Sequence, residues 1–285
     1  MSNRIEAFLS ILTRELYRVP GGYFIVQFVK NRFCSTQGSP DWRTFRFRGI
    51  TFKVDITKGM GNAIFWRGAH DWAPLFVLER VLQKGATFID VGANQGEYTL
   101  WGLRKVGPQG KVIAYEPSER LFRHLEENLG LNPEYKQVAI ARKMGLSDAP
   151  GKLKLYTKSG INEGVNSMFP SEEHDIFLNE IELSTLDKEV EILNLQAVDC
   201  LKIDVEGAEL HVLRGAERTI KKFKPVIITE VNQTSCEAAG YETLEILEFL
   251  KDRNYKLFKI GLRGKLDPIR SMLISEFSNV VAFPE

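Results

Sequence analysis

From about residue 81 onward, short apolar runs alternate with longer stretches of helical periodicity. The apolar runs cover residues 87–91, 111–115, 137–141, 200–205, 225–231, 255–260 and 279–283. Several of them are apolar throughout, as expected of strands that are covered on both faces. The stretches between them predict helices at 96–106, 118–130, 208–222 and 241–253. Strands and helices in alternation predict an α/β protein built on a parallel sheet.

The carboxyl-terminal part of the chain departs from this alternation. The last two predicted strands, 255–260 and 279–283, are joined by a loop without a crossover helix. Strands joined in this way are usually antiparallel. Residues 151–195 also interrupt the alternation, with two strand-like stretches, the polar loop 158–175 and a short helix. Because long loops inside compact domains are usually functional, we expect 151–195 to be a substrate-side insertion.

The first 80 residues have a different pattern. Residues 4–18 predict an amphipathic helix, and residues 45–56 predict a β-hairpin. The apolar positions of the helix are Ile5, Phe8, Leu9, Leu12 and Leu16. We expect this face to pack against its own domain, with peripheral docking on a membrane surface or a partner as the alternative. The predicted organisation is an N-terminal helix and hairpin extension, 1–80, packed on a main domain, 81–285.

Composition narrows the choice of partners. The 285 residues carry a net charge of +1, so the extended basic face of a nucleic-acid-binding protein is not expected. The three cysteines are widely spaced and form neither a disulfide framework nor a metal-type pair, which favours a reducing, cytoplasmic location. The longest uncharged run near the N-terminus, 19–29, is shorter than the roughly 20 residues of a membrane-spanning helix.

Glycines and an acid follow the first predicted strand of the main domain, in DVGANQG, residues 90–96. Gly92 and Gly96 let the backbone approach a ligand closely. Asn94 stands where a dinucleotide-binding loop has its middle glycine, and Asp90 would repel a pyrophosphate by about 1 kcal/mol or more at about 4 Å. The same charge attracts an ammonium or a sulfonium. The loop therefore predicts a cation-bearing nucleoside without phosphate, which is S-adenosylmethionine.

Acidic residues end three further strands at the same expected edge of the sheet. Glu116 follows the second strand, where a carboxylate can accept both hydroxyl protons of a ribose. Asp204 and Glu206 follow the fourth strand, and they point to opposite sides unless the chain turns between them. Glu230 and Asn232 end the fifth strand and share a face. They are candidates to bind an acceptor or, with Asp204, a divalent cation, although no diagnostic metal spacing is present.

Five stretches occur in an order that resembles a known family. They are DVGANQGEYT, AYEP, STLD, LKIDVEGAELHVLRGA and KPVIITEVN. The chain resembles the FkbM family of S-adenosylmethionine-dependent methyltransferases over about residues 60–260. The resemblance implies a class I methyltransferase fold, a Rossmann-like sheet of seven strands that is parallel with an antiparallel terminal hairpin strand. It also implies O-methylation of a hydroxyl on a sugar, glycan or secondary metabolite.

The resemblance also implies roles for individual residues. The methionine portion of the cofactor would be held by Asp90, Gly92, Asn94 and Gly96. Glu116 would hold the ribose. Asp204 would lie close to the methionine amine or to the transferred methyl group.

Methyl transfer is a direct displacement, so the protein must align the acceptor hydroxyl, exclude water and remove one proton. Glu206 or Glu230 is our hypothesis for the residue that accepts this proton or positions the hydroxyl, and His174 is a further candidate base. A non-catalytic or regulatory cofactor-binding module is one alternative. A methyltransferase acting on a protein, lipid or nucleic acid is another. The sequence also allows a homo-oligomer, and a divalent metal is not favoured.

Overall fold

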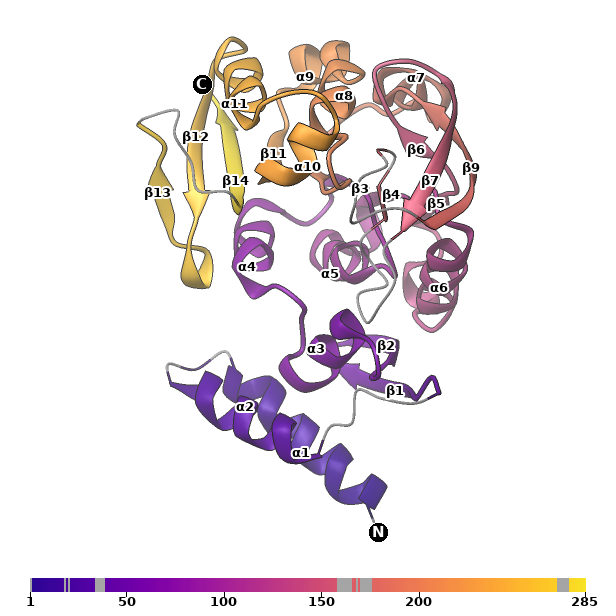
Figure 1. The fold of residues 1–285 in the computed structure, drawn as a ribbon, viewed down its shortest axis with the longest axis vertical. Helices are drawn as coiled ribbons and strands as arrows, with labels where there is room; N and C mark the ends of the chain where they lie inside the picture. Colours follow the sequence, from indigo (N-terminus) through magenta and orange to yellow (C-terminus); the bar gives the residue numbers. More distant parts are fainter. Residues whose placement is uncertain are drawn as a thin grey trace. The chain divides into compact units, whose positions relative to one another are not determined.

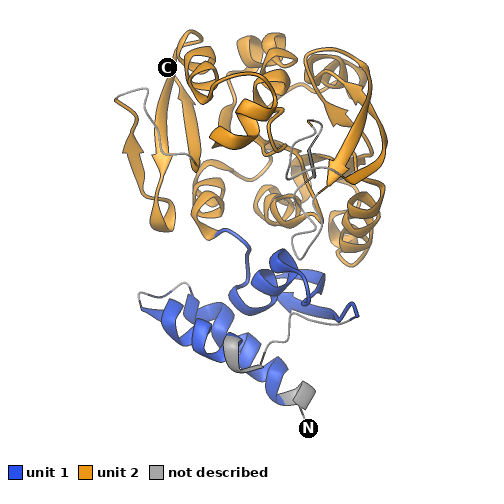
Figure 2. Ribbon diagram, viewed as in Figure 1, with its two compact units in different colours: residues 1–71, 159–164 blue, residues 72–158, 165–285 orange. Residues whose placement is uncertain are grey.

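The chain forms two compact units (Figure 2). The first contains residues 1–71 and 159–164, and the second contains residues 72–158 and 165–285. The computed structural model describes residues 2–17, 19, 21–33, 39–157, 166–167, 169, 176–270 and 277–285, with the backbone alone for 2–4 and 31–33. The second unit begins at Trp72, whose ring packs 5.3 Å from that of Phe76 and 5.4 Å from that of Trp101.

The first unit contains two helices, a β-hairpin and a third helix. Their bounds are α1 Ser2–Tyr17, α2 Gly22–Phe33, β1 Trp42–Phe47, β2 Ile50–Asp55 and α3 Gly59–Arg67. The predicted helix and the predicted hairpin are both confirmed. Arg48 and Gly49 form the two-residue turn of the hairpin with positive φ angles of 49° and 87°. Turns of this kind match the right-handed twist of the flanking strands.

Within the first unit, the apolar side of α1 is not the side that packs, and the predicted packing of the extension on the main domain stays a prediction. Ile5, Phe8 and Leu12 of α1 are exposed, whereas the polar Ser10, Thr13 and Arg14 are buried. The polar face has partners inside the unit. Arg14 donates from Nη1 to the Phe65 carbonyl oxygen at 2.9 Å, and its guanidinium lies 4.2 Å from the centre of the Phe45 ring. Hydrogen bonding and cation–π contact therefore hold the polar side of α1 inward.

The second unit is an α/β domain around a central sheet of eight strands (Figure 1). The strand order is β13-β12-β14-β11-β10-β3-β4-β5. The bounds are β3 Thr87–Val91, β4 Lys111–Tyr115, β5 Ala139–Arg142, β10 Cys200–Ile203, β11 Val226–Asn232, β12 Tyr255–Ile260, β13 Leu266–Pro268 and β14 Phe277–Pro284. All seven predicted strands lie in this sheet, and the short β13 adds an edge. The strands from β11 to β5 are parallel, and β14 is antiparallel to both β11 and β12, as predicted.

Helices and short 3₁₀ turns connect the strands of the second unit. Their bounds are α4 Trp72–Val81, α5 Glu97–Val106, η1 Gly107–Gln109, α6 Glu119–Gly130, η2 Pro133–Tyr135, α7 Leu186–Ile192, α8 Glu209–Arg214, α9 Glu217–Phe223, α10 Gln233–Ala238, α11 Thr243–Lys251 and η3 Leu262–Gly264. The helix predicted at 208–222 is divided into α8 and α9. The break falls at Gly215, which lies so close to Ser147 that a Cβ would come within 2.0 Å of its carbonyl oxygen. Among the described helices, none combines the length and hydropathy needed to cross a membrane.

The predicted insertion, 151–195, forms the helix α7 and three strands of a second sheet of four, whose remaining strand, β6, precedes it. The strands are β6 Gly145–Leu146, β7 Gly151–Thr157, β8 Asn166–Ser167 and β9 Ile176–Ser184, in the order β6-β9-β7-β8. Most of the polar loop 158–175, including the candidate base His174, lies outside the described residues.

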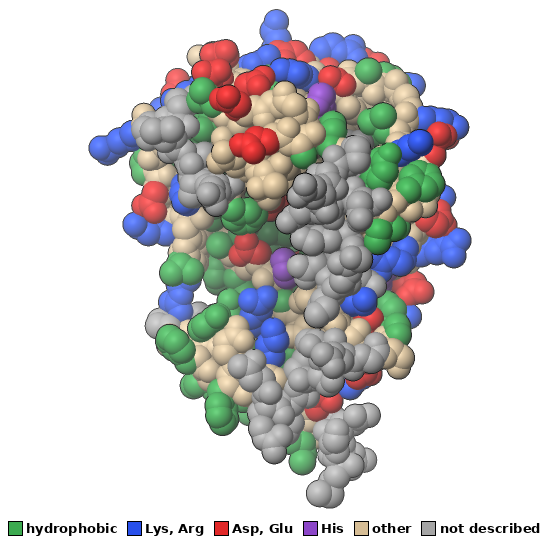
Figure 3. Space-filling view, viewed as in Figure 1, with side chains coloured by type: hydrophobic (Ala, Val, Ile, Leu, Met, Phe, Trp, Pro, Cys, Tyr) green, Lys and Arg blue, Asp and Glu red, His purple; other side chains and the backbone are tan. Residues whose placement is uncertain are grey.

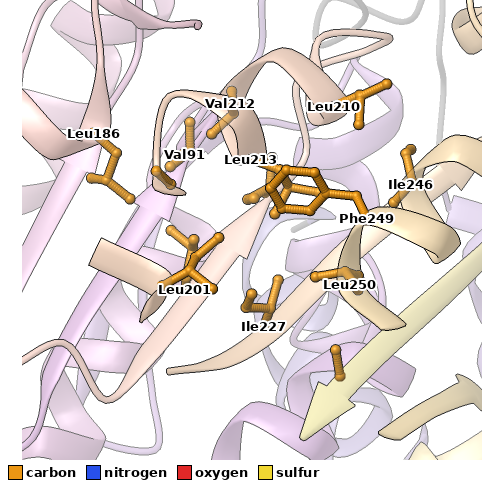
Figure 4. Packing of buried hydrophobic residues seen from close by; sticks show 14 of the residues in the cluster. Val91, Leu186, Leu201, Leu210, Val212, Leu213, Ile227, Ile246, Phe249 and Leu250 are labelled. Carbon is orange, nitrogen blue, oxygen red and sulfur yellow. The ribbon is translucent and has the colours of Figure 1, made fainter. Parts of the chain in front are cut away.

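The two faces of the central sheet carry different side chains. On one face, Val91, Leu201 and Ile227 pack toward α8 and α11, where Leu213 and Leu250 lie (Figure 4). Residues that alternate with these project to the opposite face, where α5 lies. The sheet register sets Asp90 beside Lys202 on that opposite face. The fold thus places two ionisable side chains next to each other inside the domain.

The close packing of α5 on β3 generates a prediction about Gly102. An ideal Cβ at this helical position would come within 2.4 Å of Cδ1 of the buried Phe88. Glycine to alanine normally stabilises a helix by roughly 1 kcal/mol, but overpacking of a core costs roughly 1–3 kcal/mol. We therefore expect Gly102→Ala to lower the free energy of unfolding by about 1–2 kcal/mol in urea titrations.

Gly130 provides the control, because it is also a glycine of a helix, the last residue of α6, and a Cβ there meets nothing within 4 Å. Gly130→Ala should be neutral or slightly stabilising. Equal effects of the two substitutions would contradict the packing of α5 described above.

Candidate active site

The candidate site lies where the strand order of the central sheet reverses. The neighbours β3 and β10 continue to β4 on one side and to β11 on the other. Ligands of open α/β sheets bind beyond the carboxyl ends of the strands at such a point. The glycine loop after β3 and the acids after β4, β10 and β11 all follow these carboxyl ends. The four stretches singled out in the sequence therefore meet at one edge of the sheet.

The loop between β3 and α5 is shaped by residues with positive φ. The φ angles of Gly92, Asn94 and Gly96 are 81°, 53° and 93°. A Cβ on Gly92 would lie 1.9 Å from the carbonyl oxygen of Asp204, so the loops after β3 and β10 touch through their backbones. Asn94 accepts a hydrogen bond from the Gln95 N–H on its Oδ1 at 2.8 Å. These contacts fix the loop from within the chain.

Glu116 holds the glycine loop against the end of β4. Its two carboxylate oxygens accept the backbone N–H groups of Asn94 and Ser118, each at 2.9 Å. Burial raises the pKa of Glu116 to about 7, against the opposing effect of these two N–H groups. Each oxygen keeps a second lone pair, which a ribose hydroxyl could use. Ribose binding by Glu116 stays a prediction. The structure also gives Glu116 a structural role, because it holds the backbone N–H groups of Asn94 and Ser118.

The buried residue Lys202 pairs with acids from two parts of the site, Asp90 in β3 and Asp204 after β10. Lys202 is 4 % exposed, and its Nζ lies 3.2 Å from Oδ2 of Asp204 and 3.7 Å from Oδ1 of Asp90. The same ammonium lies 4.4 Å from the centre of the Tyr98 ring. Asp90 itself is 0 % exposed and accepts the Thr99 hydroxyl on Oδ2 at 2.6 Å. Asp90 therefore lies beneath the site, and its nearest cation belongs to the chain.

The sequence analysis did not identify Lys202, Tyr98 or Thr99. Burial lowers the pKa of Lys202, but the charges of Asp204 and Asp90 outweigh this effect and raise it, so the side chain is an ammonium. A signal was present in the sequence, because a lysine between Leu201 and Ile203 inside an apolar strand must find a partner. The register of β10 against β3, which supplies that partner, was not readable from the sequence.

Three carboxyl groups meet at the outer side of Lys202. One oxygen from each of Asp204, Glu206 and Glu230 lies within 4.8 Å of the other two. Asp204 and Glu206 share a side because the strand has ended: Glu206 has a φ of 52° and Gly207 a φ of 103°. Glu209 holds this turn by accepting the backbone N–H groups of Val205 and Gly207 at 2.9 and 3.0 Å.

Two of these carboxyl groups, those of Glu206 and Glu230, have a raised pKa. Burial, followed by the charge of Asp204, raises the pKa of Glu206 to about 8 and that of Glu230 to about 10. A cation that entered the cluster would favour their ionised forms. The chemistry of the donor set fits the ammonium or sulfonium of S-adenosylmethionine, beside a loop whose glycines allow close backbone packing. Oxygen donors alone would also suit a hard divalent metal.

Comparison with known proteins assigns the family. The model of the FkbM methyltransferase domain matches residues 90–257. This protein belongs to the FkbM family of S-adenosylmethionine-dependent methyltransferases. The resemblance read from the sequence and the class I methyltransferase fold that it implied are both confirmed.

Three methyltransferases are similar in sequence to this protein. Methyltransferase 1 of Beauveria bassiana is 33% identical over 173 residues, which cover 55% of this chain and 68% of the relative. Methyltransferase sdnD of Sordaria araneosa is 30% identical, over 45% of this chain and 60% of the relative. The 2-O-methyltransferase NoeI of Sinorhizobium fredii is 25% identical, over 57% of this chain and 70% of the relative.

The buried position of Lys202 in this FkbM methyltransferase generates a prediction. Lys202→Met leaves Asp90 and Asp204 without their ammonium partner inside the domain. Breaking a buried ion pair in this way costs roughly 3–5 kcal/mol. We expect a loss of this size in the free energy of unfolding at pH 8, measured with urea. The loss should be smaller at pH 5, because an unpaired buried carboxyl group has a raised pKa and takes up a proton there.

Lys265→Met is the matched control, since Lys265 pairs with Asp267 at 2.8 Å but its side chain is exposed. It should leave the free energy of unfolding close to that of the wild type. A Lys202→Met protein as stable as this control would show that the buried ion pairs do not support the fold.

Proposed function

We propose that this protein is an O-methyltransferase that methylates a hydroxyl group of a sugar, glycan or secondary metabolite. The observation that carries the proposal is the cluster of Asp204, Glu206 and Glu230 beside the glycine loop at the sheet's switch point. It offers a place for a cationic methyl donor and a base within a few ångströms of each other. Support for the oxygen acceptor comes from the relative named 2-O-methyltransferase.

The glycine loop and the acids around it would hold S-adenosylmethionine. Gly92, Asn94 and Gly96, with their positive φ angles, would shape the turn that receives the methionine portion, and Glu116 offers its remaining lone pairs to the ribose. Asp204 is half-buried at the edge of the cluster, where it can accept the methionine ammonium. Asp90 contributes from below, by fixing Lys202 and Thr99, and not by exposed contact.

The bound cofactor supplies a methyl group already activated by its sulfonium, so the residues must position the acceptor and remove one proton. Glu206 is the better candidate for the base, because a pKa of about 8 leaves part of the carboxyl ionised near neutral pH. Glu230, with a pKa of about 10, keeps its proton and so reduces the repulsion among the three acids. In its protonated form it can also donate a hydrogen bond to the acceptor.

The oxygen donors of the cluster do not lead us to propose a metal. The Lys202 ammonium already lies 3.2 Å from Asp204 Oδ2 and supplies a positive charge there. A direct displacement at a sulfonium-bound carbon also needs no Lewis acid to activate the methyl group.

Substitution of Asp204 tests the binding of the cofactor. Asp204→Asn removes the charge that we assign to the methionine ammonium while keeping the shape of the side chain. We expect the Kd for adenosylhomocysteine in calorimetric titration to rise by about tenfold to a hundredfold, from the loss of a charged hydrogen bond. Asp267→Asn, far out on β13 and exposed, should leave the Kd unchanged. Unchanged affinity in Asp204→Asn would remove Asp204 from the cofactor site.

Substitution of Glu206 tests the chemistry. Glu206→Gln should lower kcat by about a hundredfold to ten-thousandfold, because general-base catalysis contributes about this much, while adenosylhomocysteine still binds. A base must be ionised, and the pKa of Glu206 is raised to about 8. In the wild type, kcat/KM should therefore rise with pH up to about 8 and then level off, and this rise should vanish in Glu206→Gln.

The assay uses methyl transfer from radiolabelled S-adenosylmethionine to a panel of hydroxyl-bearing sugars and metabolites. Full turnover by Glu206→Gln would exclude Glu206 as the base. Adenosylhomocysteine binding without transfer to any acceptor would instead favour a non-catalytic cofactor-binding module.

A further inference from the structure

Helix α1 presents its apolar side outward. Its polar side is held within the first unit by the Arg14 contacts described above, and by Glu6, which pairs with Arg43 at 3.2 Å. The side chains that face outward are apolar: Phe8 is 62 % exposed, and Ile5, Ile11 and Leu12 are also exposed. An amphipathic helix normally does the reverse. A covering partner outside the unit would resolve the inversion.

Helix α2 extends the exposed apolar surface. Phe24 and Phe28, one helical turn apart, are 76 % and 74 % exposed, and Tyr23 and Ile25 are exposed beside them. Val26 of the same helix is fully buried, so α2 is anchored to its unit by one side only. Hydrophobic side chains lie open along this part of the surface in Figure 3. We call the eight residues the apolar helix face: Ile5, Phe8, Ile11, Leu12, Tyr23, Phe24, Ile25 and Phe28.

The net positive charge of residues 1–71 indicates an anionic partner. Residues 1–71 contain 11 Lys and Arg against 5 Asp and Glu, a net charge of +6, whereas the remaining 214 residues carry a net charge of −5. The two acids of α1 are both paired with arginines of the hairpin, Glu6 with Arg43 and Glu15 with Arg48 at 2.6 Å. The apolar helix face therefore belongs to a strongly cationic unit whose helical acids are neutralised internally.

We infer that the apolar helix face docks on an anionic lipid bilayer. Exposed aromatic and aliphatic side chains on short helices, combined with excess Lys and Arg, are what interfacial membrane binding requires. With 16 and 12 residues, α1 and α2 are too short to span a bilayer, which needs about 20, so they lie in the plane of the interface. A second copy of the chain is disfavoured, because it would bring together two copies of residues 1–71, each with a net charge of +6.

The inference is independent of the proposed methyl acceptor, since none of the eight residues belongs to the candidate active site. The test is flotation of the full-length protein with lipid vesicles on a density gradient, in which aggregated protein sinks and bound protein rises. Vesicles of phosphatidylcholine are compared with vesicles that also contain phosphatidylglycerol, at low salt. We expect the protein to float with the anionic vesicles, and at least fivefold less of it with phosphatidylcholine alone.

The variant Phe24→Asp/Phe28→Asp should reduce flotation with anionic vesicles at least tenfold, and should keep its thermal shift with adenosylhomocysteine. Leu262→Asp is the matched control: Leu262 is 91 % exposed but lies in η3 of the second unit, so this variant should float like the wild type.

Four results would overturn the inference. In the first, the wild type stays at the bottom of the gradient with both kinds of vesicle. In the second, the double variant floats as well as the wild type. A concentration-dependent dimer that the double variant abolishes in sedimentation velocity would assign the face to a second copy. A melting temperature lowered by more than about 5 °C without vesicles, equivalent to about 1–2 kcal/mol, would show that the protein itself covers these side chains.

Discussion

The candidate site depends on one buried ammonium. Lys202 projects from the central strand β10 between Asp90 and Asp204, and it links the end of β3 to the loop after β10. Without this cation, the carboxylates would repel each other inside a domain that gives them little water. Gly92 makes the same junction possible through the backbone, because a side chain there would collide with Asp204. The ion pairs of Lys202 and the backbone contact of Gly92 with Asp204 together hold the base of the site without a ligand.

One lysine does not neutralise all the acids at this edge of the sheet. Asp204, Glu206 and Glu230 remain close together, and the raised pKa values of the two glutamates express first their burial and then the cost of ionising them beside Asp204. This excess of acidic groups would favour a cationic ligand over a neutral or phosphorylated one. The discrimination first attributed to Asp90 is therefore exerted by residues further out, with Asp90 supporting them from below.

Much of this arrangement was readable from the sequence because it rests on local pattern. Apolar runs located all seven predicted strands, and the missing crossover before β14 revealed its antiparallel direction. The glycine loop and Glu116, Asp204, Glu206 and Glu230 could be found because acids at the carboxyl ends of strands converge. The ion pair of Lys202 could not, since it depends on the register of β10 against β3, which are separated by more than 100 residues. The orientation of the faces of α1 could not be predicted either, because periodicity shows which side is apolar but not which side faces inward.

The same electrostatics that favour a cationic ligand also couple its binding to the chemistry. Without a cationic ligand, Glu206 and Glu230 are mostly protonated near neutral pH, because their pKa values are raised to about 8 and about 10, and a protonated glutamate cannot act as a base. A positive charge placed beside Asp204 would lower the pKa of Glu206 and ionise it. The carboxylate that accepts the proton of the hydroxyl would then become available mainly when the methyl donor is in place. Binding of the donor would thus also activate the base. This coupling would come from three carboxyl groups whose oxygens lie within 4.8 Å of one another, without a conformational change.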